Sequence, residues 1–272
     1  QQMMFRTNEN LYLLDRNGNE VKQLSFPINS NFSNIPISIF DYEKNRNYRF
    51  LISVDNKINM YDSNGKIVSG FKPPIFESKI INNPVHIRIN GKDYILVQLE
   101  DGSLKILDRR GRDRIIVDNK IQYSGNSIYS YLEQFTTTDK LGNLIKIDTK
   151  GNLIKENINL SVENFIDIVD NNIVYLNENR LTIKGINVEL PFSKFSKPKI
   201  FIDSKTTLVS ITDLTNNEIY LYRDNGKLVK GFPIKGSSLI DIKDSDNDGK
   251  LEIISAIDNF SIVSYEINLS QN

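Results

Sequence analysis

The chain has 272 residues, of which 39% are hydrophobic and 25% charged, and its 34 Lys and Arg residues balance its 34 Asp and Glu residues. This balance lacks the basic excess that nucleic-acid-binding proteins usually carry, and the absence of cysteine excludes disulfides, thiolate metal sites and a cysteine nucleophile. No apolar run approaches the roughly 18 residues of a membrane span, so we expect neither a nucleic-acid partner nor a membrane-spanning segment.

One short pattern recurs along the chain: alternating apolar residues, then Asp or a substitute for it, then a glycine turn. Five copies are clear and two are degenerate, and they start at Leu11, Ile58, Leu104, Leu144, Leu181, Ile219 and Ile262. Their spacing of roughly 40 residues is typical of four-stranded propeller blades, and no segment keeps a helical period. The repeats therefore predict an all-β fold, a β-propeller of about seven blade units. Eight blades in the full-length protein are the alternative.

The first repeat has an apolar segment at 3–5 and the strand from Leu11, but no innermost strand. The opening residues lack the basic and apolar regions of a signal peptide. The last repeat, in turn, lacks a fourth strand after Ile262. We therefore expect residues 1–272 to form a single propeller domain whose first and last blades are incomplete. We also expect it to be the C-terminal part of a longer chain, with the missing strands upstream of Gln1.

Residues 41–49 form a loop between two expected strands, and the loop aligns with a later acidic loop at 244–252. Arg46 stands where the later loop has glycine, and Arg49 stands where it has glutamate. We predict that arginine–carboxylate pairing closes the earlier loop and that this loop holds no metal.

The third repeat shows the expected blade most clearly. Its four strands are predicted at 85–89, 94–99, 104–108 and 114–117. Asn90-Gly91 lies between the first two, and an Asn-Gly pair between alternating strands indicates a two-residue hairpin turn. His86, the only histidine, lies in the first strand. We interpret it as structural because no second histidine could share a metal or a proton with it.

Two further residue sets have structural interpretations. Arginines gather around one turn, at Arg109, Arg110, Arg112 and Arg114. We interpret them as a solvated hairpin, because a phosphate or nucleic-acid patch needs more basic surface. A phenylalanine near a proline follows the fourth strand of three repeats, at Phe26, Phe71 and Phe232. Because large apolar side chains usually fill cores, we expect these phenylalanines to pack between neighbouring blades.

The loop 244–252 is the strongest chemical motif. Aspartates at its first, third and fifth positions, a glycine at the sixth and a glutamate at the ninth suit Ca²⁺, which takes six to eight oxygen ligands around a tightly folded loop. The predicted ligands are the side chains of Asp244, Asp246, Asp248 and Glu252 and the carbonyl of Lys250. We predict a structural Ca²⁺ ion here. The alternative is an acidic hairpin loop that binds nothing.

The repeats resemble the PQQ-like and FG-GAP (VCBS) propeller repeats, in which 244–252 corresponds to the calcium-type loop. Several runs, at 11–21, 40–42, 45–50, 91–95, 181–185 and 209–214, are similar to the C-terminal propeller of large envelope proteins of Bacteroidota. This resemblance implies an envelope protein, periplasmic or outer-membrane-associated, with an extracellular location as the alternative. It supplies no activity. PQQ-dependent dehydrogenases share the fold, but the tryptophans and paired cysteines of their cofactor sites are missing here.

Two classes of function compete, because propellers host both. One is a non-enzymatic scaffold that binds protein partners, such as envelope or outer-membrane components. The other is an enzyme, quinoprotein-like or glycan-lyase-like, that binds a sugar, cofactor or other small molecule in its central channel. The chain offers one histidine, no cysteine and no tryptophan. We therefore predict the scaffold, without catalytic or cofactor-binding residues.

Overall fold

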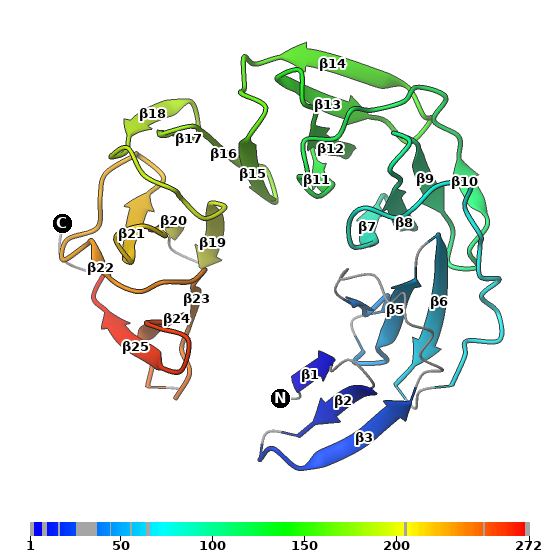
Figure 1. Ribbon diagram of the computed structural model, residues 1–272, viewed down its shortest axis with the longest axis horizontal. Coiled ribbons are helices and arrows are strands. Elements are labelled where there is room, and N and C mark those ends of the chain that lie inside the picture. Colours follow the sequence, from blue (N-terminus) through cyan, green and yellow to red (C-terminus); the bar gives the residue numbers. More distant parts are fainter. Residues whose placement is uncertain are drawn as a thin grey trace. The chain divides into compact units, whose positions relative to one another are not determined.

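The computed structural model describes residues 3–6, 10–15, 17–25, 37–43, 45–54, 56–63, 66–203, 206–246 and 248–269. These residues form strands β1 to β25 in seven antiparallel sheets (Figure 1). The described segments contain no helix, and hence none that could cross a membrane. The all-β prediction is confirmed. Phe26 lies outside the described residues, so the packing predicted for it stays a prediction.

The chain divides into two compact units, which we describe separately. The first consists of residues 1–121 and 150–152, and the second of residues 122–149 and 153–272. That 1–272 forms one domain stays a prediction.

Three sheets lie in the described part of the first unit. The first has the order β1 (Met3–Arg6), β2 (Asn10–Leu14) and β3 (Glu20–Ser25). The second has the order β4 (Ser38–Phe40), β5 (Arg49–Val54) and β6 (Lys57–Asp62). The third consists of β7 (Val85–Ile89), β8 (Lys92–Gln98), β9 (Leu104–Leu107) and β10 (Asp113–Ile115).

The described part of the second unit has four sheets. The first consists of β11 (Tyr129–Tyr131), β12 (Gln134–Thr138), β13 (Asn143–Ile147) and β14 (Leu153–Asn157). The next consists of β15 (Asn164–Val169), β16 (Asn172–Asn177), β17 (Arg180–Ile183) and β18 (Ile186–Glu189). Then come β19 (Lys199–Asp203), β20 (Thr206–Asp213), β21 (Glu218–Arg223) and β22 (Ile234–Lys235). The last consists of β23 (Asp241–Lys243), β24 (Leu251–Ala256) and β25 (Ile262–Ile267).

All seven copies of the sequence pattern fall in strands, namely β2, β6, β9, β13, β17, β21 and β25. The first and last sheets have three described strands each, as expected from their incomplete repeats. The second sheet also has three, and its predicted fourth strand is reduced to a bridge between Tyr61 and Ile67.

Local chemistry explains why the pattern repeats. After β9, the Asp108 carboxylate accepts hydrogen bonds from the backbone N–H groups of Arg110 (2.8 Å) and Arg112 (3.0 Å). Such bonds from an aspartate to the residues after it favour a tight turn. Gly111 completes the turn with a φ of 77°. The predicted Asn90-Gly91 hairpin is confirmed, with φ values of 48° and 74°.

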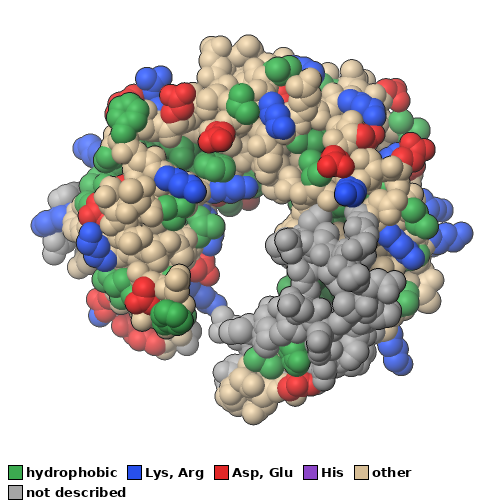
Figure 2. Space-filling view, in the orientation of Figure 1, with side chains coloured by type: hydrophobic (Ala, Val, Ile, Leu, Met, Phe, Trp, Pro, Cys, Tyr) green, Lys and Arg blue, Asp and Glu red, His purple; other side chains and the backbone are tan. Residues whose placement is uncertain are grey.

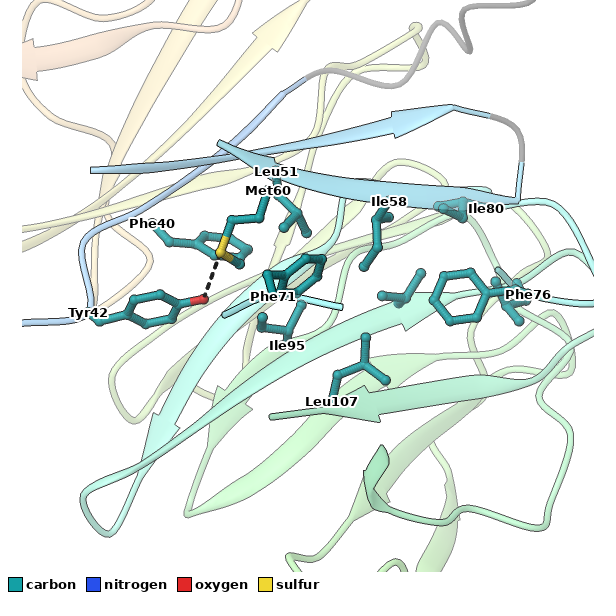
Figure 3. Close-up of a cluster of buried hydrophobic side chains, with 12 residues drawn as sticks. Phe40, Tyr42, Leu51, Ile58, Met60, Phe71, Phe76, Ile80, Ile95 and Leu107 are labelled. Carbon is teal, nitrogen blue, oxygen red and sulfur yellow. Dashed lines mark hydrogen bonds between the residues drawn. The ribbon is translucent and has the colours of Figure 1, made fainter. Parts of the chain in front are cut away.

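Apolar cores lie between successive sheets. In the first unit, buried side chains of the β4–β6 and β7–β10 sheets, including Leu51 and Ile95, surround Phe71 (Figure 3). In the second unit, Phe232 packs, partly buried, against residues of the last two sheets that include Leu221 and Ile253. The interblade packing predicted for these two phenylalanines is confirmed.

Candidate metal centre and polar clusters

The acidic loop joins β23 to β24, two strands that pair with Lys243 opposite Glu252. This pairing places Glu252 beside the loop's first residues, although seven positions of the sequence separate it from Ser245. Carboxylate oxygens of Asp244, Asp246 and Glu252 lie within 4.8 Å of one another. Three of the predicted ligands are therefore brought together at one end of a β-hairpin.

Backbone hydrogen bonds fold the loop around these carboxylates. The N–H of Gly249 donates to Asp244 Oδ2 (3.1 Å), and the N–H of Asp248 donates to Asp246 Oδ1 (3.1 Å). Gly249 has a φ of 85°, in the left-handed region that glycine adopts without strain. The Glu252 carboxylate is oriented by Ser245, whose N–H and Oγ–H both donate to Oε2 at 2.7 Å.

The loop has one polar atom that the described protein does not satisfy. Asp244 Oδ1 is buried from solvent and has no hydrogen-bond partner. A buried acceptor without a partner costs on the order of 1–3 kcal/mol, and more when it is charged. A hard cation ligated by the three carboxylates would remove this cost. The donor set therefore fits Ca²⁺.

The other two predicted ligands are placed differently. The Asp248 carboxylate accepts a hydrogen bond from the N–H of Lys250 (2.8 Å) and is not among the three that converge. The Lys250 ammonium donates to Glu266 (2.7 Å), which raises the pKa of Lys250. Metal ligation by Asp248 and by the Lys250 carbonyl stays a prediction. The Ser245 contacts were missed, because no spacing rule connects a serine to the glutamate seven positions later.

The related loop at 41–49 is closed differently from the prediction. Asp41 accepts hydrogen bonds from the backbone N–H groups of Asn45 (3.2 Å) and Arg46 (2.9 Å), and Arg49 donates to Asn47 Oδ1 (2.7 Å). The described part of this loop holds no ion pair between its own arginines and carboxylates. The predicted arginine–carboxylate closure is therefore wrong. Backbone N–H groups already donate hydrogen bonds to the Asp41 carboxylate, and the Arg49 guanidinium donates to the neighbouring Asn47.

Asp93 is the centre of a polar cluster that joins two sheets of the first unit. This side chain is only 6% exposed, and its carboxylate contacts His86 Nε2 (2.8 Å) and Arg109 Nη2 (2.6 Å). Arg109 also pairs with Glu43, and its guanidinium lies 4.4 Å from the centre of the Tyr42 ring. Burial raises the pKa of Tyr42. The His86 ring contacts this buried carboxylate on the paired strand and the rings of Phe40 and Tyr42 beside the adjacent sheet, and its structural interpretation stays a prediction.

The arginine turn is only partly the solvated hairpin that we expected. Arg112 pairs with Asp108 (2.7 Å), and Arg114 lies over the ring of Tyr94. Arg109, however, is half-buried between two carboxylates, as described above. The interpretation is wrong for Arg109, because Asp93 lies on the neighbouring strand β8 and Glu43 lies in the loop that joins β4 to β5 of the adjacent sheet. Their proximity to Arg109 follows from the sheet arrangement.

A second polar cluster joins β11–β14 to β15–β18. The amide of Asn126 donates to Asn164 Oδ1 (2.9 Å) and to Thr138 Oγ1 (2.8 Å), and all three side chains are buried. Asn126 Oδ1 accepts a hydrogen bond from the N–H of Ile166 (3.2 Å). Because buried polar groups need partners, this network fixes one arrangement of the two sheets. The side chains of this cluster use their hydrogen-bonding groups on one another.

Charges of both signs are interspersed over the surface. On the face in Figure 2, the described Lys and Arg side chains alternate with Asp and Glu side chains. Ion pairs join many of them along the outer strands, as between Lys146 and Glu156 (2.5 Å) and between Arg180 and Glu189 (2.8 Å).

No protein family matches the chain, and no curated protein matches it. Solved structures do. BamB from Moraxella catarrhalis is 13% identical with a TM-score of 0.59, over 100% of this chain and 80% of BamB. BBS1N, solved in complex with ARL6DN, is 11% identical with a TM-score of 0.65, over 99% of this chain and 87% of BBS1N. The fold is a β-propeller.

A third propeller with this fold is PorZ, described as an essential bacterial surface component of the type-IX secretion system of Porphyromonas gingivalis. It is 14% identical with a TM-score of 0.54, over 99% of this chain but only 36% of PorZ. At such identities these likenesses show the fold alone, since one fold hosts many functions.

Proposed function

We propose that this propeller is a non-enzymatic scaffold of the bacterial cell envelope, periplasmic or outer-membrane-associated, that binds protein partners. One observation carries the proposal. The histidine and its buried aspartate, which would be the natural candidates for proton transfer, are held between two sheets by Arg109. They serve to join blades, and the buried Asp93 carboxylate is already in contact with His86 and Arg109.

Two of the similar propellers support the class of partner and the location. BBS1N was solved with a bound protein, ARL6DN, and PorZ is a bacterial surface component. Propellers of this size therefore offer surfaces large enough for a protein partner. The partner of this chain would be an envelope or outer-membrane component.

We further propose that Ca²⁺ is a structural part of this scaffold. Asp244, Asp246 and Glu252 would hold the ion, with Asp248 and the Lys250 carbonyl as further ligands. The ion would satisfy the buried Asp244 oxygen and tie the start of β24 to the end of β23. A structural ion of this kind contributes stability and no reaction step.

Purification of the full-length protein from native envelope membranes tests the scaffold. We expect an outer-membrane or secretion component to co-purify in stoichiometric amount. A chromophore or sugar that co-purifies instead, bound where carboxylates converge on it, would overturn the proposal in favour of a channel enzyme.

A further inference from the structure

A continuous belt of loops crosses the second unit at one end of its strands. It consists of the loops 139–142, 158–163, 178–179, 190–198, 214–217, 236–240 and 257–261. Because the sheets are antiparallel, the loops from second to third strands and the connections to the next sheet lie at the same end. We call these seven segments the loop belt.

Hydrogen bonds join each part of the loop belt either to the next part or to the strand residue that comes just before it. They are Ile158 N to Gly142 O (3.1 Å), Ser161 N to Asn177 Oδ1 (2.6 Å), Leu190 N to Asn179 O (2.8 Å), Leu214 N to Lys194 O (2.8 Å), Gly236 N to Asn217 O (3.0 Å) and Ser237 N to Ala256 O (2.7 Å). The belt is therefore one connected surface, and its loops are held in place before any partner binds.

The loop belt carries exposed apolar side chains on six of its seven loops. They are Leu141, Val162, Phe192, Leu214, Leu239, Ile257 and Phe260. The two phenylalanines are the most exposed, at 93% and 97%. Single exposed apolar residues are ordinary on protein surfaces. Their recurrence on successive loops of one connected belt, with two projecting aromatic rings, is characteristic of an interaction surface.

Hydrogen bonds hold both of the loops that carry the phenylalanines. Beside Phe192, the Ser193 hydroxyl donates to Asp213 Oδ1 (2.5 Å). The N–H of Phe260 donates to Asp258 Oδ1 (2.7 Å), and the N–H of Ile257 donates to the Ser261 carbonyl (3.0 Å). A ring on a pre-organised loop loses little conformational entropy on binding, and this raises the affinity that it contributes.

The charges around the rings indicate the kind of partner. The exposed charged residues of the loop belt are Lys140, Lys194, Lys197, Glu163, Glu178 and Asp258, three of each sign. Such a balance gives no attraction for an anionic lipid surface or for nucleic acid. It does match the mixed polar rim around the apolar centre of a protein interface. Because the two phenylalanine rings project from the surface, the partner must provide recesses that receive them. The loop belt of a second copy of this chain presents projecting loops and does not provide such recesses.

We propose that the loop belt is the partner-binding face of this scaffold, with Phe192 and Phe260 as anchors that enter apolar recesses of a different folded protein. The inference rests on the proposed scaffold function and adds the face and the contact chemistry. Aromatic anchors at the centre of an interface commonly account for most of its binding energy.

Site-specific photo-crosslinking in the native envelope tests the face. The full-length protein carries a benzophenone amino acid at position 192 or 260, or, as matched controls, at the exposed positions Leu132 or Ile154 outside the belt. We expect one defined protein to be crosslinked from 192 and 260 and not from the controls. Crosslinks from the control positions alone would overturn the inference and leave the scaffold function standing. No protein crosslinked from any position would contradict both.

The crosslinked protein is then purified and titrated by calorimetry. The Phe192→Ser/Phe260→Ser variant should bind at least about tenfold more weakly, the loss that anchors of more than about 1 kcal/mol produce. The Leu132→Ser/Ile154→Ser variant should bind like the native protein. Melting temperatures should stay unchanged, because all four side chains are exposed. Unchanged affinity, crosslinking to a second copy of the chain, or sedimentation with phosphatidylethanolamine–phosphatidylglycerol vesicles that the phenylalanine variant abolishes would each overturn the proposal.

Discussion

Asp167 shows how the fold acts on a single side chain. It lies on β15, half-buried, where its Oδ2 accepts a hydrogen bond from the N–H of Ile200 on β19 (2.7 Å). Burial raises the pKa of the Asp167 carboxyl above its ordinary value of 3.8, despite this hydrogen bond and the nearby Lys199. The folded state therefore binds the Asp167 proton more tightly than the unfolded state does.

The stability contributed by a carboxyl with a raised pKa is fully present below the unfolded value and is lost as the pH rises through the folded value. Asp167→Asn keeps a side-chain acceptor for Ile200 and cannot ionise. We therefore expect the variant to gain stability relative to the native protein between about pH 4 and about pH 7. Urea unfolding at both pH values measures this difference. If the stability difference between the variant and the native protein is the same at both pH values, the Asp167 carboxyl titrates alike in the folded and unfolded states.

The acidic loop at 244–252 allows a second test at the residue scale. An ion that binds only the folded state stabilises it, by about 2.7 kcal/mol at a concentration 100 times its Kd. The melting temperature should therefore rise from EDTA to millimolar Ca²⁺, and Asp246→Ala should abolish the rise. Asp41→Ala, in the related loop at 41–49, should leave the rise intact. A native protein that melts alike in EDTA and in calcium would rule out the site.

At the scale of single elements, turns decide how the strands of a blade are joined. Gly102, in the turn between β8 and β9, has a φ of 88°, and a Cβ there would lie 2.8 Å from the Ile121 carbonyl oxygen. Gly91, in the turn between β7 and β8 of the same sheet, has a φ of 74° with nothing within 4 Å.

Alanine substitutions at these two glycines therefore distinguish the cost of backbone strain from the cost of close packing. Gly91→Ala should cost about 1–2 kcal/mol, the strain of a left-handed conformation with a Cβ. Gly102→Ala should cost about 1–3 kcal/mol more, because overpacking is added. Chemical denaturation of both variants measures the difference. Equal losses would mean that the segment around Ile121 can move away at little cost.

How far the sequence predicts each feature depends on whether its cause is local. The aspartate–glycine turns and the Asn90-Gly91 hairpin are local, and the strands around them were predicted. The fourth strand of the third sheet was predicted at 114–117 and lies at Asp113–Ile115 with a register shift, because a short edge strand carries little pattern. The contact of Arg109 with Glu43, 66 positions away, depends on which sheets are neighbours and could not be predicted.

The candidate site follows the same rule. The convergence of Asp244, Asp246 and Glu252 could be predicted because one hairpin supplies all three. The loop belt could not be predicted, since it joins seven loops that lie between positions 139 and 261. The sequence alone does not distinguish the exposed Phe192 from the phenylalanines that fill the cores.

The whole molecule combines a propeller fold, balanced charge and buried ionisable groups that join blades. We propose on these features that the propeller offers a surface for protein recognition. We propose that this surface lies on the loop belt of the second unit and that the acidic loop at 244–252 holds a structural Ca²⁺ ion in the last sheet.

The central claim, that this propeller binds a protein partner, is tested most directly by native mass spectrometry of the full-length protein purified gently from its envelope. We predict a complex whose mass equals the sum of this protein, one defined second protein and a bound calcium ion. A mass that equals the protein alone, or the protein with a sugar or an organic cofactor, would contradict it.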